Sequence, residues 1–424
     1  MTSFEPPSSL VDSILGGRCL AFIGAGFSVP VMPSWGELLE GLAGRLDVEG
    51  RAPEPGNALH FEAFGQWLRD QAGARWEPLV KQVLDERLVA ATPAARAAMR
   101  VRLDLLRRIP FKAILTTNFD PTLEATATTL APEVYAEVLR DERARWWNAP
   151  SATTHELPRT PLLKLHGDAN GDPLRLPLVL GRDDYRQRVY ADRNYANFIR
   201  AAFAEYSVLF IGVSFTDAYL NELRSEVLHL VHRRDGAPPW GYAVVRNPSP
   251  MFCEFMRKHE GIEVLPIAEF HEVERRLGAI ADRTSIEGRL ATLLANKRVV
   301  WIDPNPQNNE LGRALLTQTG AVASLTSLDQ LTSAHHDADL LLTHFGYDGP
   351  GRSHAFELLD RLRGWPQRPP VIVFASGDAT PEQLGANRRE CLRRGAWEYA
   401  TEWGELYRAI ELVLGRVPGQ SASY

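Results

Sequence analysis

The chain has 424 residues, which is too long for one ordinary hydrophobic core and predicts two or three domains. A hydrophobic share of 45% with 24% charged residues is typical of a soluble globular protein. The net charge of -6 argues against a broad nucleic-acid-binding surface, so we do not expect a nucleic acid as a direct partner.

The cysteines indicate a reducing compartment. Only Cys19, Cys253 and Cys391 are present, far apart and without a C-x-x-C pair, so neither a structural zinc site nor a disulfide framework is expected. The first ten residues, MTSFEPPSSL, lack the basic patch and apolar core of a signal peptide. Because no apolar run approaches the roughly 18 residues of a membrane helix, we predict a cytoplasmic protein with no membrane partner.

The first predicted strand leads into a glycine-rich turn. The apolar run Leu20–Ile23 is followed directly by Gly24-Ala25-Gly26-Phe27-Ser28. In doubly wound α/β proteins such a turn brings backbone amides against a phosphate, and a Cβ at either glycine would block the approach. The third glycine of the dinucleotide fingerprint is absent, so an ordinary NAD dehydrogenase is not indicated. The alternative is a turn that only needs positive φ.

Residues 37–108 read mostly as a helical insertion, broken at Pro53, Pro55 and Gly56. Strand patterns resume at 113–116, 162–165, 208–211 and 242–245, with a helix at 183–204. The first three of these strands end in small or polar clusters: Thr117-Asn118-Phe119-Asp120, His166-Gly167-Asp168 and Gly212-Val213-Ser214-Phe215. Because parallel strands bind ligands outside their carboxyl ends, we predict a Rossmann-like doubly wound parallel sheet with one crevice.

A second α/β unit follows a charged helical stretch at 271–296. We predict a first domain at 1–284, a linker at 285–297, a small flavodoxin-like domain at 298–416 and a frayed tail at 417–424. The pattern of the second domain gives strands at 299–303, 338–342 and 371–376, and helices at 310–319, 354–363, 383–394 and 403–414.

Four motifs, GAGFS at 24–28, TTNFD at 116–120, KLHGD at 164–168 and GVSF at 212–215, together resemble the sirtuin-like NAD-consuming family over roughly residues 10–270. Ser28-Val29-Pro30 and Pro33-Ser34-Trp35 resemble the bacterial branch of NAD hydrolases, which serves antiviral defence. The resemblance implies NAD+ as substrate. It places Gly24, Ala25, Gly26 and Ser28 at the pyrophosphate, Asn118 and Asp120 at the nicotinamide ribose, His166 as catalytic base, and Gly212 and Ser214 at the adenine-side ribose. Thr117 and Asp217 are further candidates for dinucleotide binding.

The chemistry of these residue types fits that assignment. Nicotinamide leaves as a neutral molecule while the ribose gains oxocarbenium character, so a positioned nucleophile and a proton acceptor help more than a general acid. The His166 imidazole is suited to accept the proton. The Asn118 amide can hold a water or a ribose hydroxyl, and Asp120 can orient the carboxamide or brace its loop. The alternatives are a packed histidine, and an Asn and Asp that only end a strand.

The departures from the family bear on the reaction. Protein deacylases of the sirtuin class carry a four-cysteine zinc module that frames the peptide channel, and it is missing here. We therefore expect no zinc, and water as the acceptor, which gives NAD+ hydrolysis to nicotinamide and ADP-ribose. The alternatives are a deacylase or ADP-ribosyltransferase, and a catalytically silent NAD-binding sensor.

From Val299 onward the chain resembles a response-regulator receiver, with Asp303 and Ser376 at the ends of its first and fourth strands. Thr343 or His344 stands where the phosphoacceptor aspartate belongs, and Glu402 stands where the lysine belongs. We expect a pseudo-receiver that accepts no phosphate and is suited to sensing, to an activating partner or to homo-oligomer formation.

Overall fold

The computed structural model describes residues 4–48, 58–125, 127–129, 160–171, 177–215, 221, 224–225, 238–305, 307, 316, 322–346, 353–375 and 380–415. The chain divides into two compact units, Met1–Thr284 and Ser285–Tyr424. Among the described helices, none has the length and apolar character needed to cross a membrane.

The first unit is built on a seven-stranded sheet with the order β3-β4-β2-β1-β5-β6-β7. Every strand pair is parallel, which confirms the predicted doubly wound, Rossmann-like α/β fold. The strands are β1 (Cys19–Ile23), β2 (Ile114–Thr116), β3 (Ala127–Thr129), β4 (Thr160–Lys164), β5 (Ser207–Ile211), β6 (Gly241–Arg246) and β7 (Ile262–Ile267).

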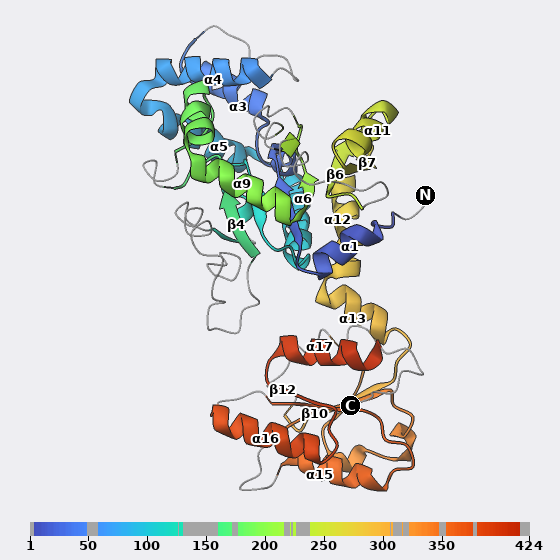
Figure 1. The fold of residues 1–424 in the computed structure, drawn as a ribbon. Helices are drawn as coiled ribbons and strands as arrows, with labels where there is room; N and C mark the ends of the chain where they lie inside the picture. Colours follow the sequence, from blue (N-terminus) through green and yellow to red (C-terminus); the bar gives the residue numbers. More distant parts are fainter. Residues whose placement is uncertain are drawn as a thin grey trace. The chain divides into compact units, whose positions relative to one another are not determined.

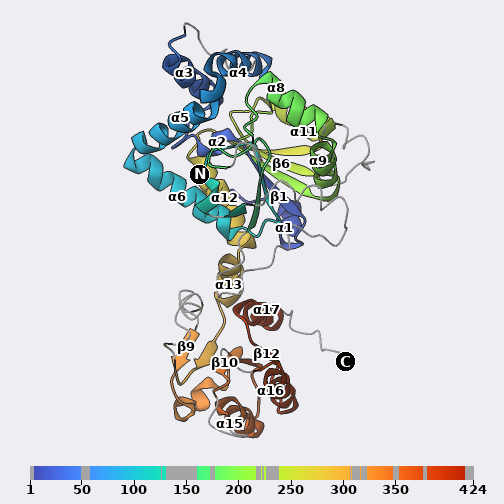
Figure 2. The ribbon, with the colours of Figure 1, turned by 90° about the vertical axis from the view of Figure 1, so that its left-hand side faces the viewer.

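Helices cover both faces of this sheet (Figures 1 and 2). They are α1 (Ser8–Leu15), α2 (Ala25–Ser28), α3 (Trp35–Arg45), α4 (Ala58–Ala72), α5 (Trp76–Ala90), α6 (Pro93–Arg108), α8 (Arg182–Tyr185), α9 (Arg193–Glu205), α11 (Pro250–His259) and α12 (Glu272–Thr284). The side chains of β1 point alternately to the two faces of the sheet. Ala21 and Ile23 join the core with α6 and α12, whereas Leu20 and Phe22 join the core with α9 and α11.

Helix α3 begins two residues before the predicted start at 37, because Ser34 forms a capping box with Glu37. The Ser34 Oγ accepts from the Glu37 N–H at 3.4 Å, and Glu37 Oε2 accepts from the Ser34 N–H at 2.7 Å. Helix α6 begins at Pro93 with Thr92 as its cap. The predicted helix breakers at 53–56 lie outside the described residues.

Two predictions for the first unit differ from the structure. The helix expected at 183–204 is interrupted by η4, a π-helical turn at Arg186–Ala191, and Asp192 then caps α9 by accepting from the Asn194 N–H at 3.0 Å. Strands β3 and β7 were not predicted. Both lie at the edges of the sheet, and β7 contains Pro266, a residue that argues against a strand in a sequence pattern.

The second unit holds a five-stranded parallel sheet with the order β12-β11-β10-β8-β9. The strands are β8 (Val299–Ile302), β9 (Val322–Leu325), β10 (Leu340–His344), β11 (Val371–Phe374) and β12 (Glu398–Ala400). Numbered within the unit, the order is 2-1-3-4-5, which is the flavodoxin-like arrangement that we predicted. Strands β9 and β12 were not predicted, and the helix expected at 310–319 falls almost wholly outside the described residues.

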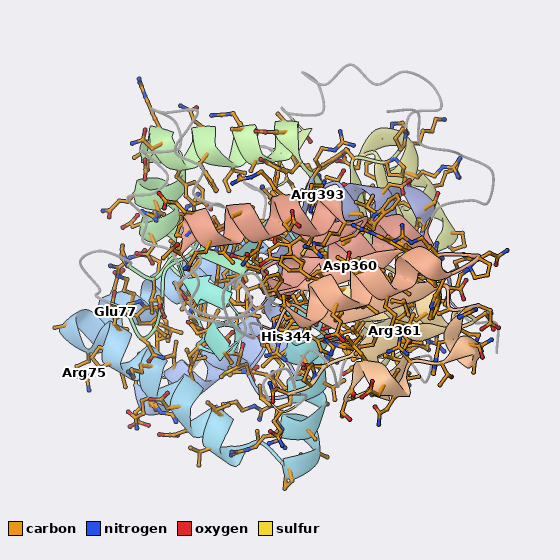
Figure 3. The ribbon with its side chains drawn as sticks, turned by 90° about the horizontal axis from the view of Figure 1, so that it is seen from below. Arg75, Glu77, His344, Asp360, Arg361 and Arg393 are labelled. Atoms are coloured by element: carbon orange, nitrogen blue, oxygen red, sulfur yellow. The ribbon has the colours of Figure 1, made fainter. Side chains whose placement is uncertain are left out.

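Four described α-helices pack on this sheet: α13 (Ile286–Leu294), α15 (His354–Arg361), α16 (Pro381–Arg393) and α17 (Trp403–Leu414). An ion pair between Arg394, the residue after α16, and Asp360 of α15 joins these neighbouring helices. Figure 3 labels Asp360 and Arg361 on α15 and Arg393 at the end of α16. Most of the segment expected to be a linker, 285–297, is the helix α13. Ser285 caps it, and Leu290 and Leu294 are fully buried in the core with α17.

Candidate active site

A cavity of about 810 Å³ lies at the carboxyl ends of the central strands of the first unit. Its wall includes Gly24 after β1, Asn118 after β2, His166 after β4, Gly212 after β5 and Arg246 at the end of β6. These five strands are consecutive in the sheet, in the order β4-β2-β1-β5-β6. The four loops singled out in the sequence therefore line one cavity at the edge where parallel sheets bind ligands.

The glycines after β1 are required by a close contact between two backbones. A Cβ on Gly24 would lie 2.5 Å from the carbonyl oxygen of Gly212, and a Cβ on Gly26 would lie 3.0 Å from the same atom. A Cβ on Gly212 would lie 2.2 Å from the Phe27 nitrogen. The sequence pattern attributes these glycines to the approach of a phosphate, but packing against the end of β5 already demands them. Gly24 has a φ of -105°, so the positive-φ alternative fails there, whereas Gly212 has a φ of +69°.

Asn118 is held in one orientation by the glycine turn. Its side chain is 5% exposed, and Nδ2 donates to the Gly24 carbonyl and to Ser28 Oγ, both at 3.2 Å. Its backbone N–H donates to Thr116 Oγ1 at 3.0 Å. Its Oδ1 has no hydrogen-bond partner among the described residues, although it is buried. Because a buried acceptor without a donor is costly, the site is suited to a ligand that donates a hydrogen bond, such as a hydroxyl.

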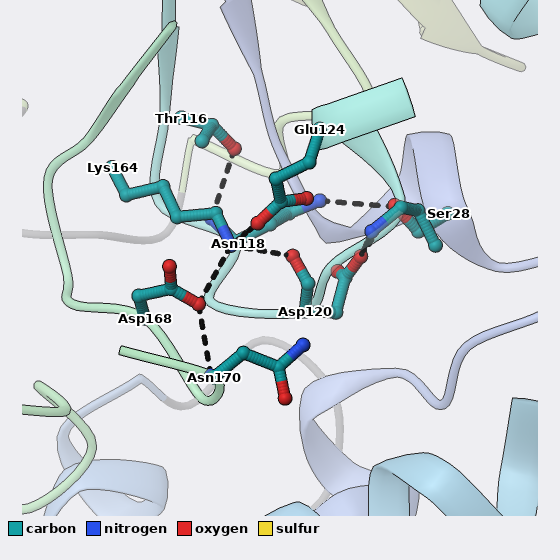
Figure 4. A network of polar contacts seen from close by, with 9 residues as sticks. Ser28, Thr116, Asn118, Asp120, Glu124, Lys164, Asp168 and Asn170 are labelled. Atoms are coloured by element: carbon teal, nitrogen blue, oxygen red, sulfur yellow. Dashed lines mark hydrogen bonds and ion pairs between the residues drawn. The ribbon is translucent and has the colours of Figure 1, made fainter. Parts of the chain in front are cut away.

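Asp120 lines the cavity and also belongs to a polar network that joins two loops of the site (Figure 4). Its Oδ1 accepts from the Thr122 N–H at 3.0 Å and from the Thr122 hydroxyl. The Thr122 hydroxyl lies 3.0 Å from Ser28 Oγ, which in turn accepts from Asn118. Asp120, Thr122, Ser28 and Asn118 thus form one continuous chain of hydrogen bonds that joins the loop after β2 to the turn after β1.

Lys164, the last residue of β4, joins the loops after β2 and β4 (Figure 4). It is 2% exposed, and its Nζ donates to the Asp120 carbonyl at 2.9 Å and to Asp168 Oδ1 at 3.0 Å. It also forms an ion pair with Glu124. Burial raises the pKa of the Glu124 carboxyl, and the attraction of Lys164 offsets that effect only in part. The ammonium therefore connects Asp120 to the strand that carries the KLHGD motif.

His166 lies two residues beyond the end of β4 and is 5% exposed. Its ring meets the ring of Tyr185 edge to face, with centroids 5.3 Å apart, and its carbonyl accepts from the Val179 N–H at 2.9 Å. Both His166 and Tyr185 line the cavity. The imidazole is therefore held at the cavity wall by a neighbouring aromatic ring.

The remaining predicted residues take different places. Thr117, Ala25 and Ser214 line the cavity. Ser28 is fully buried and is not among the described residues of the cavity wall, so its position fits bracing of Asn118 better than contact with a ligand. Asp217 lies outside the described residues.

Several wall residues were not predicted as site residues. Trp35 and Phe61 stack with centroids 5.3 Å apart, and they bring α3 and α4 of the helical insertion to the cavity. Phe215 has a φ of +56°, an uncommon backbone conformation for a bulky side chain. Arg246 is the one arginine or lysine among the described wall residues. The sequence held a signal for Trp35, which follows the turn motif, but none for Phe61, whose position depends on helix packing.

In the second unit, Asp303 follows β8 and is 1% exposed, and Thr343 and His344 end β10. Ser376 lies outside the described residues, and Glu402 is the residue before α17. Across the described part of the chain, no group of three His, Cys, Asp or Glu side chains is placed to hold a metal ion.

Residues 112–265 match the family model described as SIR2-like domain. The match covers less than half of the chain and includes the loops after β2, β4 and β5, whereas the glycine turn and the helical insertion precede it. Comparison with curated proteins finds no match. SIR2-like domains are NAD-dependent enzymes, so the chain is similar to a class with NAD-related activity over the region that supplies Asn118 and His166.

Proposed function

We propose that the first unit hydrolyses NAD+ at the bond between nicotinamide and ribose, giving nicotinamide and ADP-ribose. The observation that carries the proposal is the buried Asn118 Oδ1, which has no hydrogen-bond partner in the described part of the chain and lies in a cavity wall that also contains His166. An acceptor fixed in this way fits a ribose hydroxyl or a water molecule, which are the donors that the reaction brings. The similarity of residues 112–265 to SIR2-like domains supports the same substrate.

In the proposed reaction the bond from C1′ of the ribose to the nicotinamide nitrogen breaks, and the electron pair leaves with nicotinamide. A water oxygen forms the new bond to C1′, and His166 takes the proton of that water. Asn118 orients the water or the adjacent ribose hydroxyl. Because Asp120 Oδ1 is engaged by Thr122, we assign Asp120 to bracing of the loop rather than to the carboxamide.

The other predicted residues would hold the rest of the substrate. In this proposal Gly24, Ala25 and Gly26 lie beside the pyrophosphate, with Thr117 next to them, and Gly212 and Ser214 lie beside the adenine-side ribose. Water is the favoured acceptor because the chain has three cysteines and lacks the four-cysteine module of protein deacylases.

The test is release of nicotinamide and ADP-ribose from NAD+, measured by chromatography for the wild type, His166→Ala and Asn118→Ala. We expect each substitution to lower the rate by about 100-fold or more, since it removes the proton acceptor or the orienting amide. His259→Ala, an exposed histidine on α11, is the matched control and should keep the wild-type rate. Wild-type activity in His166→Ala would exclude the proposed base. Release that requires a peptide would favour the deacylase or ADP-ribosyltransferase, and binding without release would favour the sensor.

We further propose that the second unit is a pseudo-receiver that restrains this activity until a signal arrives, as part of antiviral defence by NAD+ depletion. Its flavodoxin-like strand order and the Thr343-His344 pair at the end of β10 support this proposal. A hydroxyl and an imidazole at that place do not supply the carboxylate nucleophile of a phosphorylated receiver. The same nicotinamide assay, repeated with lysate from phage-infected cells, should show a higher rate than with lysate from uninfected cells.

A further inference from the structure

Arg102 is a buried cation that lies outside the cavity wall and is held by three different segments. It lies within α6, and its side chain is only 2% exposed. Nε donates to Glu274 Oε1 at 2.7 Å, Nη1 to the Phe27 carbonyl at 2.8 Å, and Nη2 to the Phe270 carbonyl at 2.8 Å. Phe27 and Phe270 line the cavity, whereas Arg102 is not among the described residues of its wall.

These contacts connect two parts of the cavity wall, the turn that contains Phe27 and the segment that contains Phe270. The Phe27 carbonyl belongs to α2, a single helical turn whose last carbonyls have no partner within the helix. The Phe270 carbonyl lies between β7 and α12, and Glu274 lies in the first turn of α12. One guanidinium thus fixes the glycine turn, the segment after β7 and the helical insertion relative to one another.

The contact with Phe27 also reaches Asn118. The Phe27 carbonyl shares its peptide group with the nitrogen of Ser28, and Ser28 Oγ accepts from Asn118 Nδ2 at 3.2 Å. Displacement of that peptide would move the hydroxyl that orients the Asn118 amide. We propose that Arg102 is a positioning residue, which holds the turn at 24–28 and, through Ser28, the Asn118 side chain in the geometry that binds the dinucleotide. The inference rests on the proposed function for its ligand and on the hydrogen bonds of Arg102 for its mechanism.

Arginine is specifically suited to this place. Its planar guanidinium donates in several fixed directions, so it can reach two carbonyls and a carboxylate on different segments. A lysine keeps the charge and the ion pair with Glu274 but cannot reproduce this fork. Arg102→Lys therefore tests position rather than charge. Because Glu274 Oε2 already lacks a partner among the described residues, removing Arg102 alone would leave an uncompensated carboxylate.

The experiment compares Arg102→Lys, the double variant Arg102→Met with Glu274→Met, and Arg100→Met, an exposed arginine on the same helix as control. In Arg102→Lys we expect KM for NAD+ to rise about tenfold through loss of a charge-assisted hydrogen bond, with a smaller change in kcat. The double variant should show at least the same rise while it stays folded, since the buried guanidinium and its partner carboxylate are removed together. Arg100→Met should match the wild type.

Amide hydrogen exchange supplies a readout that does not depend on NAD+. The backbone amides of peptides that cover 24–32 and 266–274 should exchange faster in both Arg102 variants than in the wild type. In Arg100→Met their exchange rates should equal those of the wild type. The measurement is made at temperatures where the wild type and all three variants are folded. Unchanged exchange and unchanged KM in the double variant would overturn the positioning role. A fall in kcat and in melting temperature at constant KM and constant local exchange would also overturn it, because that pattern indicates general stability. A wild type that neither cleaves nor binds NAD+ would refute the proposed function, and the exchange measurement would still decide the role of Arg102.

Discussion

Gly212 has no room for a side chain at the cavity. An added Cβ would lie 2.2 Å from the Phe27 nitrogen and 2.8 Å from the Gly26 carbonyl carbon, and its φ of +69° disfavours any other residue. Relief would require the end of β5 to move away from the glycine turn. We expect Gly212→Ala to destabilise the first unit by about 2 kcal/mol or more, measured by thermal unfolding, and to impair NAD+ cleavage.

Gly278 provides the matched control for this substitution. It lies inside α12, and an added Cβ would meet nothing within 4 Å. Gly278→Ala should stabilise the protein by about 0.5–1 kcal/mol, because alanine loses less backbone entropy in a helix. If Gly212→Ala unfolds at the same temperature as Gly278→Ala, the backbone contact between the turn and β5 is not as close as described.

At the level of single residues, the sequence could place Asn118, His166 and Gly24 at the cavity because each lies one or two residues after an apolar strand. Parallel strands bring such positions to one edge of the sheet, so their convergence follows from strand type alone. The role of Ser28 could not be predicted, since its partners Asn118 and Thr122 lie about ninety residues away in the sequence. Arg102 gave no signal either, because a charged residue in a helix normally faces solvent.

Lys164 holds the loops after β2 and β4 together at the carboxyl ends of the strands. Its substitution therefore tests how these elements support the site. Lys164→Met would leave Glu124 and Asp168 without their shared cation and the Asp120 carbonyl without a donor. We expect the free energy of unfolding to fall by about 2–3 kcal/mol, measured by thermal unfolding. Lys297→Met, which removes a half-exposed pair with Asp339, should cost about 1 kcal/mol or less.

The loss in Lys164→Met should depend on pH. Burial raises the pKa of Glu124, and the variant removes the attraction that lowers it, so the folded variant binds a proton at higher pH than the unfolded chain. A raised carboxyl pKa contributes stability below the unfolded pKa and loses it as pH rises through the folded pKa. The difference in melting temperature between Lys164→Met and the wild type should therefore be smaller at about pH 5 than at pH 8. A difference that grows on acidification would contradict the burial of Glu124.

Among the elements, the central strands were predictable and the edges were not. The residues of β1, β2, β4 and β5 form apolar runs because neighbours cover both faces of each strand. Strand β7 alternates less clearly and contains Pro266, and η4 interrupts an otherwise helical pattern where Asp192 starts a new helix. The pattern Ser34-x-x-Glu37 and the pair Thr92-Pro93 are helix-start signals in the sequence, and the hydrogen bonds of both caps show that they act as such.

At the scale of the whole chain, each unit has its own parallel sheet and its own buried core. The sequence indicated both sheets through their alternating strand and helix patterns, and it placed a linker between them at 285–297. It predicted the helical stretch at 271–296 but did not assign α13 to the second core, because a nine-residue amphipathic segment between two domains has the same pattern whichever core it joins.

Where the second unit begins can be tested with two fragments, 285–424 and 298–424. Helix α13 packs on α17, Arg289 pairs with Glu411 at 3.0 Å, and Leu290 and Leu294 are each 0% exposed. Starting at 298 removes this cover from the sheet and exposes the face of α17 beneath it. Since each buried leucine contributes about 2 kcal/mol or more, we expect 285–424 to unfold cooperatively and 298–424 to melt at a much lower temperature or to aggregate.

Two point variants of the longer fragment serve as controls. The melting temperature of Leu290→Ala should fall between those of the two fragments, whereas Thr292→Ala, an exposed position on the same helix, should melt near the parent fragment. The melting temperatures are measured by circular dichroism. If the two fragments melt at the same temperature, 285–297 is a linker, as predicted from the sequence.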